Sequence, residues 1–256
     1  MKKLLLISGL ALGLAASANA AIIAQDNGSN YGGGWNTGTN GGSGFGNWDF
    51  ASNQGTGSAG TFIGNPADAS ITGMSVTSFG LYANPVGSNA TIDVNRSFSS
   101  ALSVGDTFSV QWGLNFDSGS GGGNKGLNIY AGGTSGTQLI NINMGTSQAI
   151  TINGNPMFAN YGTAAMTLSF QLTTGTNLHV SGIGRDGSES YSGNFTVAAA
   201  PDAFRFYANN LDTGDNRQPY FNNLQIASVP EPSAFALIGL GLAGLCIRRL
   251  KSRKDA

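Results

Sequence analysis

The chain has 256 residues, of which 40 are Gly and only 10 % are charged, against about 25 % in an average globular protein. So little charge disfavours a helical enzyme, whose helix surfaces need Glu, Lys, Arg and Ala, and the 40 % of hydrophobic residues disfavours a disordered chain. Between residues 21 and 229, eleven acidic residues outnumber five dispersed basic ones, which gives this segment a net charge of −6. Nucleic-acid binding needs clustered cations and is therefore excluded.

The first twenty residues have the three parts of an export signal. Lys2 and Lys3 form a short positive segment, residues 4–16 are apolar, and Ala18-Asn19-Ala20 has the small-x-small pattern that signal peptidase accepts. We therefore expect residues 1–20 to be a signal peptide that is removed after Ala20. A retained membrane helix would need a longer apolar run.

Residues 26–60 are rich in Gly, Asn and Ser but also contain five aromatic residues, which a flexible linker would lack. We predict that this segment forms the first strands with long loops, and that its aromatics supply core or a binding face. The five aromatic residues are Tyr31, Trp35, Phe45, Trp48 and Phe50.

Eleven strand-like runs follow, separated by turn residues. Apolar and polar residues alternate clearly in residues 139–144 and 166–172, as expected for strands with one buried and one wetted face. No helix of ten or more residues is expected between the runs. The pattern predicts an all-β fold, a two-sheet antiparallel sandwich of the jelly-roll kind. The expected strands are residues 78–83, 90–98, 107–114, 126–130, 138–144, 149–152, 166–172, 177–183, 190–197, 203–207 and 220–226.

Most of residues 26–226 loosely resembles a module that is frequent in secreted bacterial proteins. The resemblance implies a concanavalin-like jelly roll and assigns no biochemical role. The segments that carry it are residues 44–48 (GFGNW), 79–83 (FGLYA), 102–108 (LSVGDTF), 204–207 (FRFY) and 220–224 (YFNNL).

Sugar binding is the sharpest functional hypothesis for this body. Flat aromatic rings stack on sugar faces, while Asn, Asp and Gly backbone groups bind the hydroxyls, and the body is rich in all of them. Trp112 alternates with Phe108 and Val110 and is expected in the core. A structural or adhesive coat protein without a defined ligand remains an alternative, as does a glycan hydrolase. The rings expected to contact glycan are Tyr31, Trp35, Trp48 and Tyr220.

Catalytic and metal-binding patterns are weak in the body. His179 is the sole histidine and is expected to be an ordinary strand residue, and Glu189 is the sole glutamate between residues 21 and 229. A Ser-His-Asp triad or a strand of paired glutamates therefore lacks its parts. We expect no enzyme activity, no cofactor and no metal, with Asp212 and Asp215 as a weak calcium candidate.

The C-terminus has three ordered parts. Val229-Pro230-Glu231-Pro232 precedes an apolar run over residues 234–247, which contains the lone Cys246, and Arg248 and Arg249 begin a basic tail. As a helix, the run would span about 21 Å at 1.5 Å per residue, short for a ~30 Å hydrocarbon core, but flanking cations can snorkel. The cations keep the tail cytoplasmic and place the body outside. An ordinary membrane anchor would explain the run and the cations, but not the Pro-Glu-Pro.

This tail resembles the PEP-CTERM sorting signal, also known as the "ice-binding protein C-terminal" motif. The resemblance implies recognition by an exosortase, a membrane enzyme of Gram-negative bacteria that make exopolysaccharide. Cleavage near the Pro-Glu-Pro would follow inner-membrane anchoring, and would release the body or attach it at the cell surface. We therefore expect a signal peptide (1–20), an extracellular β-sandwich (21–228) and a sorting signal (229–256). The expected partners are signal peptidase, exosortase and exopolysaccharide of a biofilm matrix.

Overall fold

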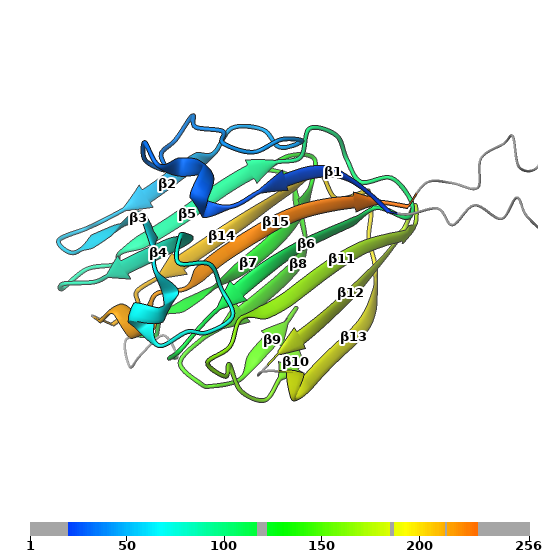
Figure 1. The fold of residues 1–256 in the computed structure, drawn as a ribbon. Coiled ribbons are helices and arrows are strands. Elements are labelled where there is room, and N and C mark those ends of the chain that lie inside the picture. Colours follow the sequence, from blue (N-terminus) through cyan, green and yellow to red (C-terminus); the bar gives the residue numbers. More distant parts are fainter. Residues whose placement is uncertain (1–19, 117–121, 185–186, 213, 230–256) are drawn as a thin grey trace, which may run out of the picture. The chain divides into compact units, whose positions relative to one another are not determined.

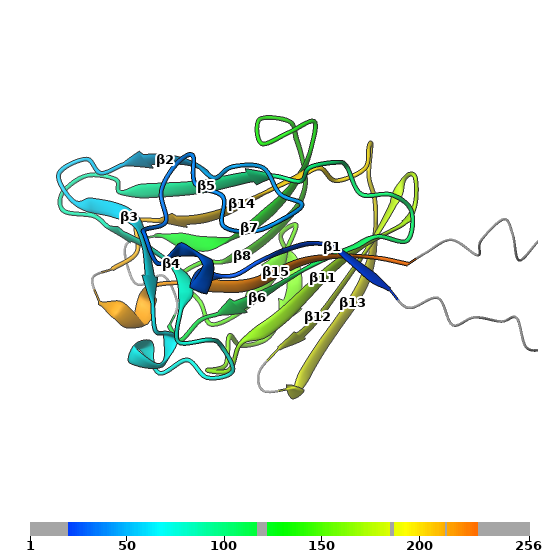
Figure 2. The same ribbon diagram turned by 45° about the horizontal axis from the view of Figure 1, so that its top comes forward.

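A computed structural model describes residues 20–116, 122–184, 187–212 and 214–229. Residues Ile22–Ser228 form one compact unit, and the described hydrophobic core lies within it. Strands dominate this unit (Figures 1 and 2). The described helices are short 3₁₀ turns: η1 (Gly28–Tyr31), η2 (Pro66–Ala69) and η4 (Asp215–Arg217).

One sheet has eight antiparallel strands in the order β13-β12-β11-β6-β15-β4-β3, and β1 adds to it by pairing with β15. Its strands are β1 (Ala21–Asp26), β3 (Ser58–Gly64), β4 (Ser78–Asn84), β6 (Thr107–Gly113), β11 (Met166–Thr174), β12 (Asn177–Gly184), β13 (Glu189–Thr196) and β15 (Tyr220–Ser228).

The other sheet has seven antiparallel strands in the order β10-β9-β8-β7-β14-β5-β2. Its strands are β2 (Asp49–Asn53), β5 (Thr91–Ser97), β7 (Asn124–Ala131), β8 (Thr137–Met144), β9 (Ile150–Ile152), β10 (Asn155–Phe158) and β14 (Ala203–Asn209).

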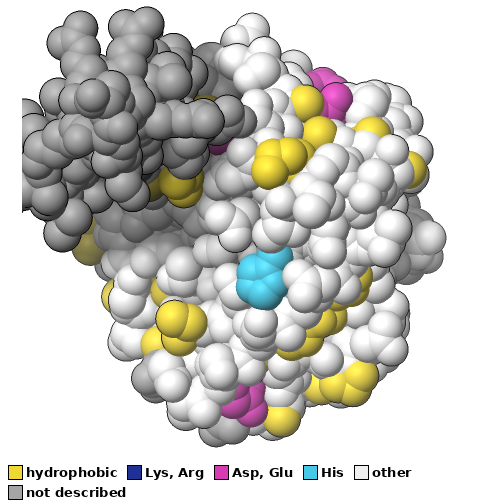
Figure 3. All heavy atoms as spheres, turned by 90° about the vertical axis from the view of Figure 1, so that its right-hand side faces the viewer, with side chains coloured by type: hydrophobic (Ala, Val, Ile, Leu, Met, Phe, Trp, Pro, Cys, Tyr) yellow, Lys and Arg dark blue, Asp and Glu magenta, His cyan; other side chains and the backbone are white. Residues whose placement is uncertain are grey.

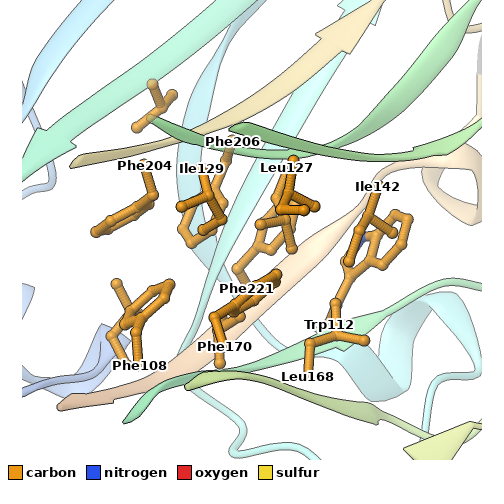
Figure 4. Close-up of a cluster of buried hydrophobic side chains, with 14 of the residues drawn as sticks. Phe108, Trp112, Leu127, Ile129, Ile142, Leu168, Phe170, Phe204, Phe206 and Phe221 are labelled. Carbon is orange, nitrogen blue, oxygen red and sulfur yellow. The ribbon is translucent and has the colours of Figure 1, made fainter. Parts of the chain in front are cut away.

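The core fills the space between the two sheets. Buried and more exposed residues alternate along β6 and along β11, so each strand turns its apolar side chains to the facing sheet. Phe206 and Phe221 stack across the interface with ring centroids 3.9 Å apart, and Phe108 and Phe204 do so at 5.1 Å (Figure 4). Trp112 is fully buried among them, as predicted.

The sandwich confirms the predicted fold class, and all eleven predicted strands are present to within a few residues. Sequence patterns missed β1, which directly follows the export signal, and β10, which contains Pro156. The first strands predicted for residues 26–60 are present as β2 and β3, and β3 runs on to Gly64. β1 begins at Ala21, immediately after the predicted cleavage point, and its partner β15 ends at Ser228.

Several predictions on the two chain ends lie outside the described residues. These are the helix of the signal peptide with Ala18, the segment from Pro230 to Pro232, the apolar run and the basic tail. Within the described ranges, no helix combines the length and the hydropathy needed to cross a membrane.

Candidate functional site

Polar side chains cover the outer face of the seven-stranded sheet. On β5, β7, β8 and β14, residues such as Ile92, Leu127, Ile142 and Phe206 point into the core. Their neighbours in sequence therefore point away from it. These outward positions carry asparagine, aspartate, arginine, tyrosine and threonine, which together give the face a continuous polar surface.

The strand register aligns these side chains in rows. One row runs Asp93, Tyr207, Gly126 and Asn143. The next runs Asn95, Arg205, Asn128 and Asn141. Neighbours in a row lie about 4.8 Å apart across strands, and the rows are about 6.7 Å apart along them. The result is a regular grid of amide and hydroxyl groups.

The face is hollowed into a depression of about 540 Å³. That volume lies within the range of about 300–1,000 Å³ that small-molecule sites occupy. Its lining is almost wholly polar, with Asn contributing five of nine residues. The lining consists of Thr91, Asp93, Asn124, Asn128, Asn141, Asn143, Arg205, Tyr207 and Asn209.

One ion pair balances the charge of the depression. Arg205 Nη1 lies 3.2 Å from Asp93 Oδ2, and the guanidinium also donates to Asn95 Oδ1 at 2.7 Å. Burial raises the pKa of Asp93 above its ordinary value of 3.8, while the Coulomb attraction of Arg205 opposes that shift. Because the guanidinium already has these partners, no excess cation is left in the lining to attract an anion.

The floor is held rigid by side-chain hydrogen bonds. Asn141 Nδ2 donates to Asn128 Oδ1 at 2.7 Å and to Tyr207 Oη at 3.0 Å, and Tyr207 Oη donates to Asn143 Oδ1 at 2.9 Å. Burial raises the pKa of Tyr207, so this hydroxyl stays protonated. A Cβ added at Gly126 would lie 1.9 Å from the carbonyl oxygen of Ile142 and 2.8 Å from Tyr207 Oη. Glycine at this position therefore lets the Tyr207 hydroxyl lie over the strand.

Around this floor, polar atoms remain available to a ligand. Asn209 Nδ2 donates to Asn124 Oδ1 at 2.8 Å, which leaves the other amide atom of each residue without a protein partner among the described residues. The side-chain nitrogen of Asn143 (Nδ2) and the hydroxyl of Thr91 likewise have no hydrogen-bond partner within the described chain. The depression therefore presents donors and acceptors on a rigid surface whose two charges, on Asp93 and Arg205, cancel.

The four aromatic residues predicted to contact glycan do not lie at this site, and that prediction is wrong for each ring. Tyr31, Trp35, Trp48 and Tyr220 are between 1 % and 5 % exposed. Each ring packs against other aromatics; Trp35 and Trp48, for example, meet edge to face at 5.2 Å. A ring buried on both faces has none left to stack on a sugar.

A buried ion pair explains why Tyr31 and Trp48 turn inward. Arg96 Nη1 lies 2.5 Å from Asp26 Oδ2, with neither side chain exposed, and the guanidinium lies 4.4 Å from the centre of the Trp48 ring. Tyr31 Oη donates to Asp26 and accepts from Trp48 Nε1 at 2.7 Å. Polar atoms in the segment that follows β1 thus provide hydrogen-bond partners for Asp26 and Arg96. Without such partners, burying these two charges would be costly.

The remaining predicted residues lie apart from the depression. Tyr220 belongs to a small second cluster with Ala69 and Ile71. His179 lies in β12, as predicted, and its Nδ1 forms a hydrogen bond with Asn194 Oδ1 at 3.0 Å. Asp212 follows β14, and Asp215 begins η4. Within the described ranges, no group of three or more His, Cys, Asp or Glu side chains is placed so that it could bind a metal ion.

Sequence reasoning missed the asparagine-rich face. Its signal was present, because polar residues occupy alternate positions in four predicted strands, as in Asn141 and Asn143. Alternation alone identifies an outer face without telling which outer faces share a sheet. The strand order, which brings β5 beside β14 and β14 beside β7, was needed to assemble the grid.

Several solved structures match this chain at low identity. A Botulinum neurotoxin serotype D ligand binding domain in complex with N-acetylneuraminic acid has 11 % identity and a TM-score of 0.39, covering 72 % of this chain. The match covers only 46 % of that toxin chain, less than half of its length. No curated protein matches the chain.

Two further structures show the same level of likeness. The Ca²⁺-bound VIP36 exoplasmic/lumenal domain has 13 % identity and a TM-score of 0.39, covering 72 % of this chain and 84 % of its own. An alginate lyase of polysaccharide lyase family 7 has 8 % identity and a TM-score of 0.36, covering 57 % of this chain and 79 % of its own. Similarity this remote assigns no ligand to the chain.

The C-terminal segment matches a family model. Residues 228–250 match the PEP-CTERM protein-sorting motif, the range that holds the Pro-Glu-Pro, the apolar run and Arg248-Arg249. The motif implies an exported protein that an exosortase sorts to the outside of the cell. This chain therefore carries a PEP-CTERM protein-sorting signal behind an all-β sandwich.

Proposed function

We propose that this protein is a non-catalytic surface or extracellular-matrix protein that binds an uncharged polysaccharide through the depression on its seven-stranded sheet. The observation that carries the proposal is the lining itself: amide and hydroxyl groups at strand spacing, over a floor held by Tyr207 and Asn141. Sugars bind through many neutral hydrogen bonds, each contributing about 0.5–1.5 kcal/mol.

The charge of the depression favours a neutral glycan over an acidic one. Asp93 and Arg205 neutralise each other, and the other seven lining residues carry no charge. A uronate or sulfate group would meet the Asp93 carboxylate without gaining an unpaired cation. Asp93 is also the one carboxylate in the described lining, whereas glycoside hydrolysis normally needs two. Both features support binding without turnover.

The sequences of the two chain ends support delivery to the outside of the cell. Residues 1–20 would direct export and be removed beside β1, and residues 229–256 would hold the body at the inner membrane until an exosortase acts. Replacing Pro230, Glu231 and Pro232 together by Ala should leave full-length protein in the membrane fraction, because the apolar run and the cations are kept. If the variant were still cleaved and its β-sandwich released as in the parent, the proposed role of the motif would be contradicted.

Glycan binding is tested with residues 21–228, which contain the whole compact unit. The probes are neutral polysaccharides (dextran, laminarin, galactomannan, xyloglucan) and acidic ones (alginate, hyaluronate). We expect saturable binding of at least one neutral polymer, none of the acidic ones, and no new reducing ends. Release of oligosaccharides would indicate a hydrolase or lyase instead, and absence of binding across both groups would favour a coat protein without a ligand.

A further inference from the structure

β13 forms an open edge of the eight-stranded sheet. In the described part of the chain it pairs with β12 alone. That pairing runs through eight consecutive residue pairs, from Asn177 opposite Thr196 to Gly184 opposite Glu189, without a bulge. The outer edge of such a strand presents backbone N–H and C=O groups that a further strand can bind.

This edge lacks the devices that usually protect a sheet edge. At the corresponding end of the seven-stranded sheet, β10 is only four residues long, contains Pro156 and is interrupted by a register shift. Charged side chains, proline and bulges discourage pairing with other chains. β13 has no proline, lysine or arginine, and its single charge, Glu189, lies at its first position.

We propose that β13 pairs antiparallel with β13 of a second copy of this chain, with Gly193 opposite Gly193. In this register Tyr191 lies opposite Phe195 of the second copy, and Ser192 lies opposite Asn194. Glu189 lies opposite Val197, so the two glutamates are at opposite ends of the interface and do not repel each other. An isologous contact of this kind closes on itself and gives a dimer.

The two faces of β13 fit this partner. Tyr191 and Phe195 face the core side and are only partly buried at its margin. Opposite each other in the dimer, they would form aromatic cross-strand pairs and cover that margin. On the other face, Ser190, Ser192, Asn194 and Thr196 are exposed and uncharged, so the pairing brings no charges together.

The sheet beside β13 continues this uncharged surface. Ser192, Ser181, Ser169 and Ser109 stand in register across β13, β12, β11 and β6. The surface around the single histidine, shown in cyan, is mostly uncharged on its described part (Figure 3). Two copies joined through β13 would therefore extend one polar, neutral sheet without electrostatic repulsion.

The dimer is tested by sedimentation equilibrium of residues 21–228. A Ser190→Lys/Thr196→Lys variant places like charges directly opposite each other at two sites, and should weaken the dimer by about tenfold. A Ser190→Lys/Thr196→Glu variant places opposite charges there and should dimerise at least as tightly as the parent. Thr167→Lys/Thr173→Lys, on the interior strand β11, is the control for added charge.

Circular dichroism establishes that all four proteins are folded. A parent protein that stays monomeric up to its solubility limit would overturn the proposal. Equal weakening by the Lys/Lys and Lys/Glu variants would overturn the Gly193-centred register. Neither outcome depends on glycan binding, which is measured separately at the opposite sheet.

Discussion

The guanidinium of Arg96 lies 2.5 Å from the carboxylate of Asp26, and neither side chain is exposed to solvent. Asp26 is the last residue of β1 and Arg96 lies in β5, so this ion pair joins the two sheets. It also organises the loop that follows β1, because Arg96 Nε donates to the Gly46 carbonyl and Nη2 donates to Asn40 Oδ1. The pair therefore fixes an unusually Gly-rich segment against the sandwich.

Replacing Asp26 by Asn should strongly destabilise the protein. The isosteric amide leaves the Arg96 charge buried without a counter-charge, which costs about 3–5 kcal/mol. Asp93→Asn is the matched control, because the Asp93–Arg205 pair is about one-third exposed and should contribute less than about 1 kcal/mol. Urea unfolding of both variants measures the difference, and equal losses of stability would refute this assignment.

Trp48→Phe should lower stability without altering glycan affinity. The change removes the indole N–H that donates to Tyr31 Oη and weakens the contact with the Arg96 guanidinium, a loss of about 1–3 kcal/mol. Because the ring is 1 % exposed, it has no surface for a sugar. A folded Trp48→Phe protein with much weaker glycan binding would show that the ring contacts ligand after all.

Gly126→Ala should destabilise the seven-stranded sheet by about 1–3 kcal/mol. The new Cβ would lie 1.9 Å from the main-chain oxygen of Ile142, which cannot rotate away. Gly175→Ala is the control, because nothing lies within 4 Å of its added Cβ. The control should be neutral or slightly stabilising. Thermal unfolding compares the two, and a neutral Gly126→Ala would contradict the close approach of β8 to β7.

The stability difference between the parent and Asp93→Asn should depend on pH. Burial raises the pKa of Asp93 above 3.8, so the folded state binds a proton more readily than the unfolded state. The parent therefore loses stability as pH rises from 3.8 through the raised pKa, and the Asn variant does not. As the pH is raised from 3 to neutrality, the unfolding free energy of the parent should therefore fall relative to that of the Asn variant. A difference that is constant across this interval, or of opposite sign, would contradict the raised pKa.

Local patterns were sufficient for most of the fold and insufficient for the site. The alternation in residues 139–144 is sufficient to predict β8, because one face of that strand is buried and the other is wetted. Trp35 and Trp48 were misplaced because their Gly-rich surroundings look like an exposed loop. Trp48 packs against the guanidinium of Arg96, and Trp35 packs against Trp48. Arg96 lies 48 residues after Trp48 in the sequence, and no local pattern reveals its burial. The asparagine grid likewise depends on which strands become neighbours.

The central claim is that the polar depression binds a neutral polysaccharide, and calorimetric titration of a Thr91→Ala/Asn143→Ala variant tests it most directly. Both side chains line the depression, and losing two neutral hydrogen bonds should weaken binding of a neutral polymer roughly ten- to a hundredfold. Ser169→Ala/Ser181→Ala, on the outer face of the other sheet, should bind like the parent. Unchanged affinity in the Thr91/Asn143 variant, or an equal loss in the serine control, would contradict the claim.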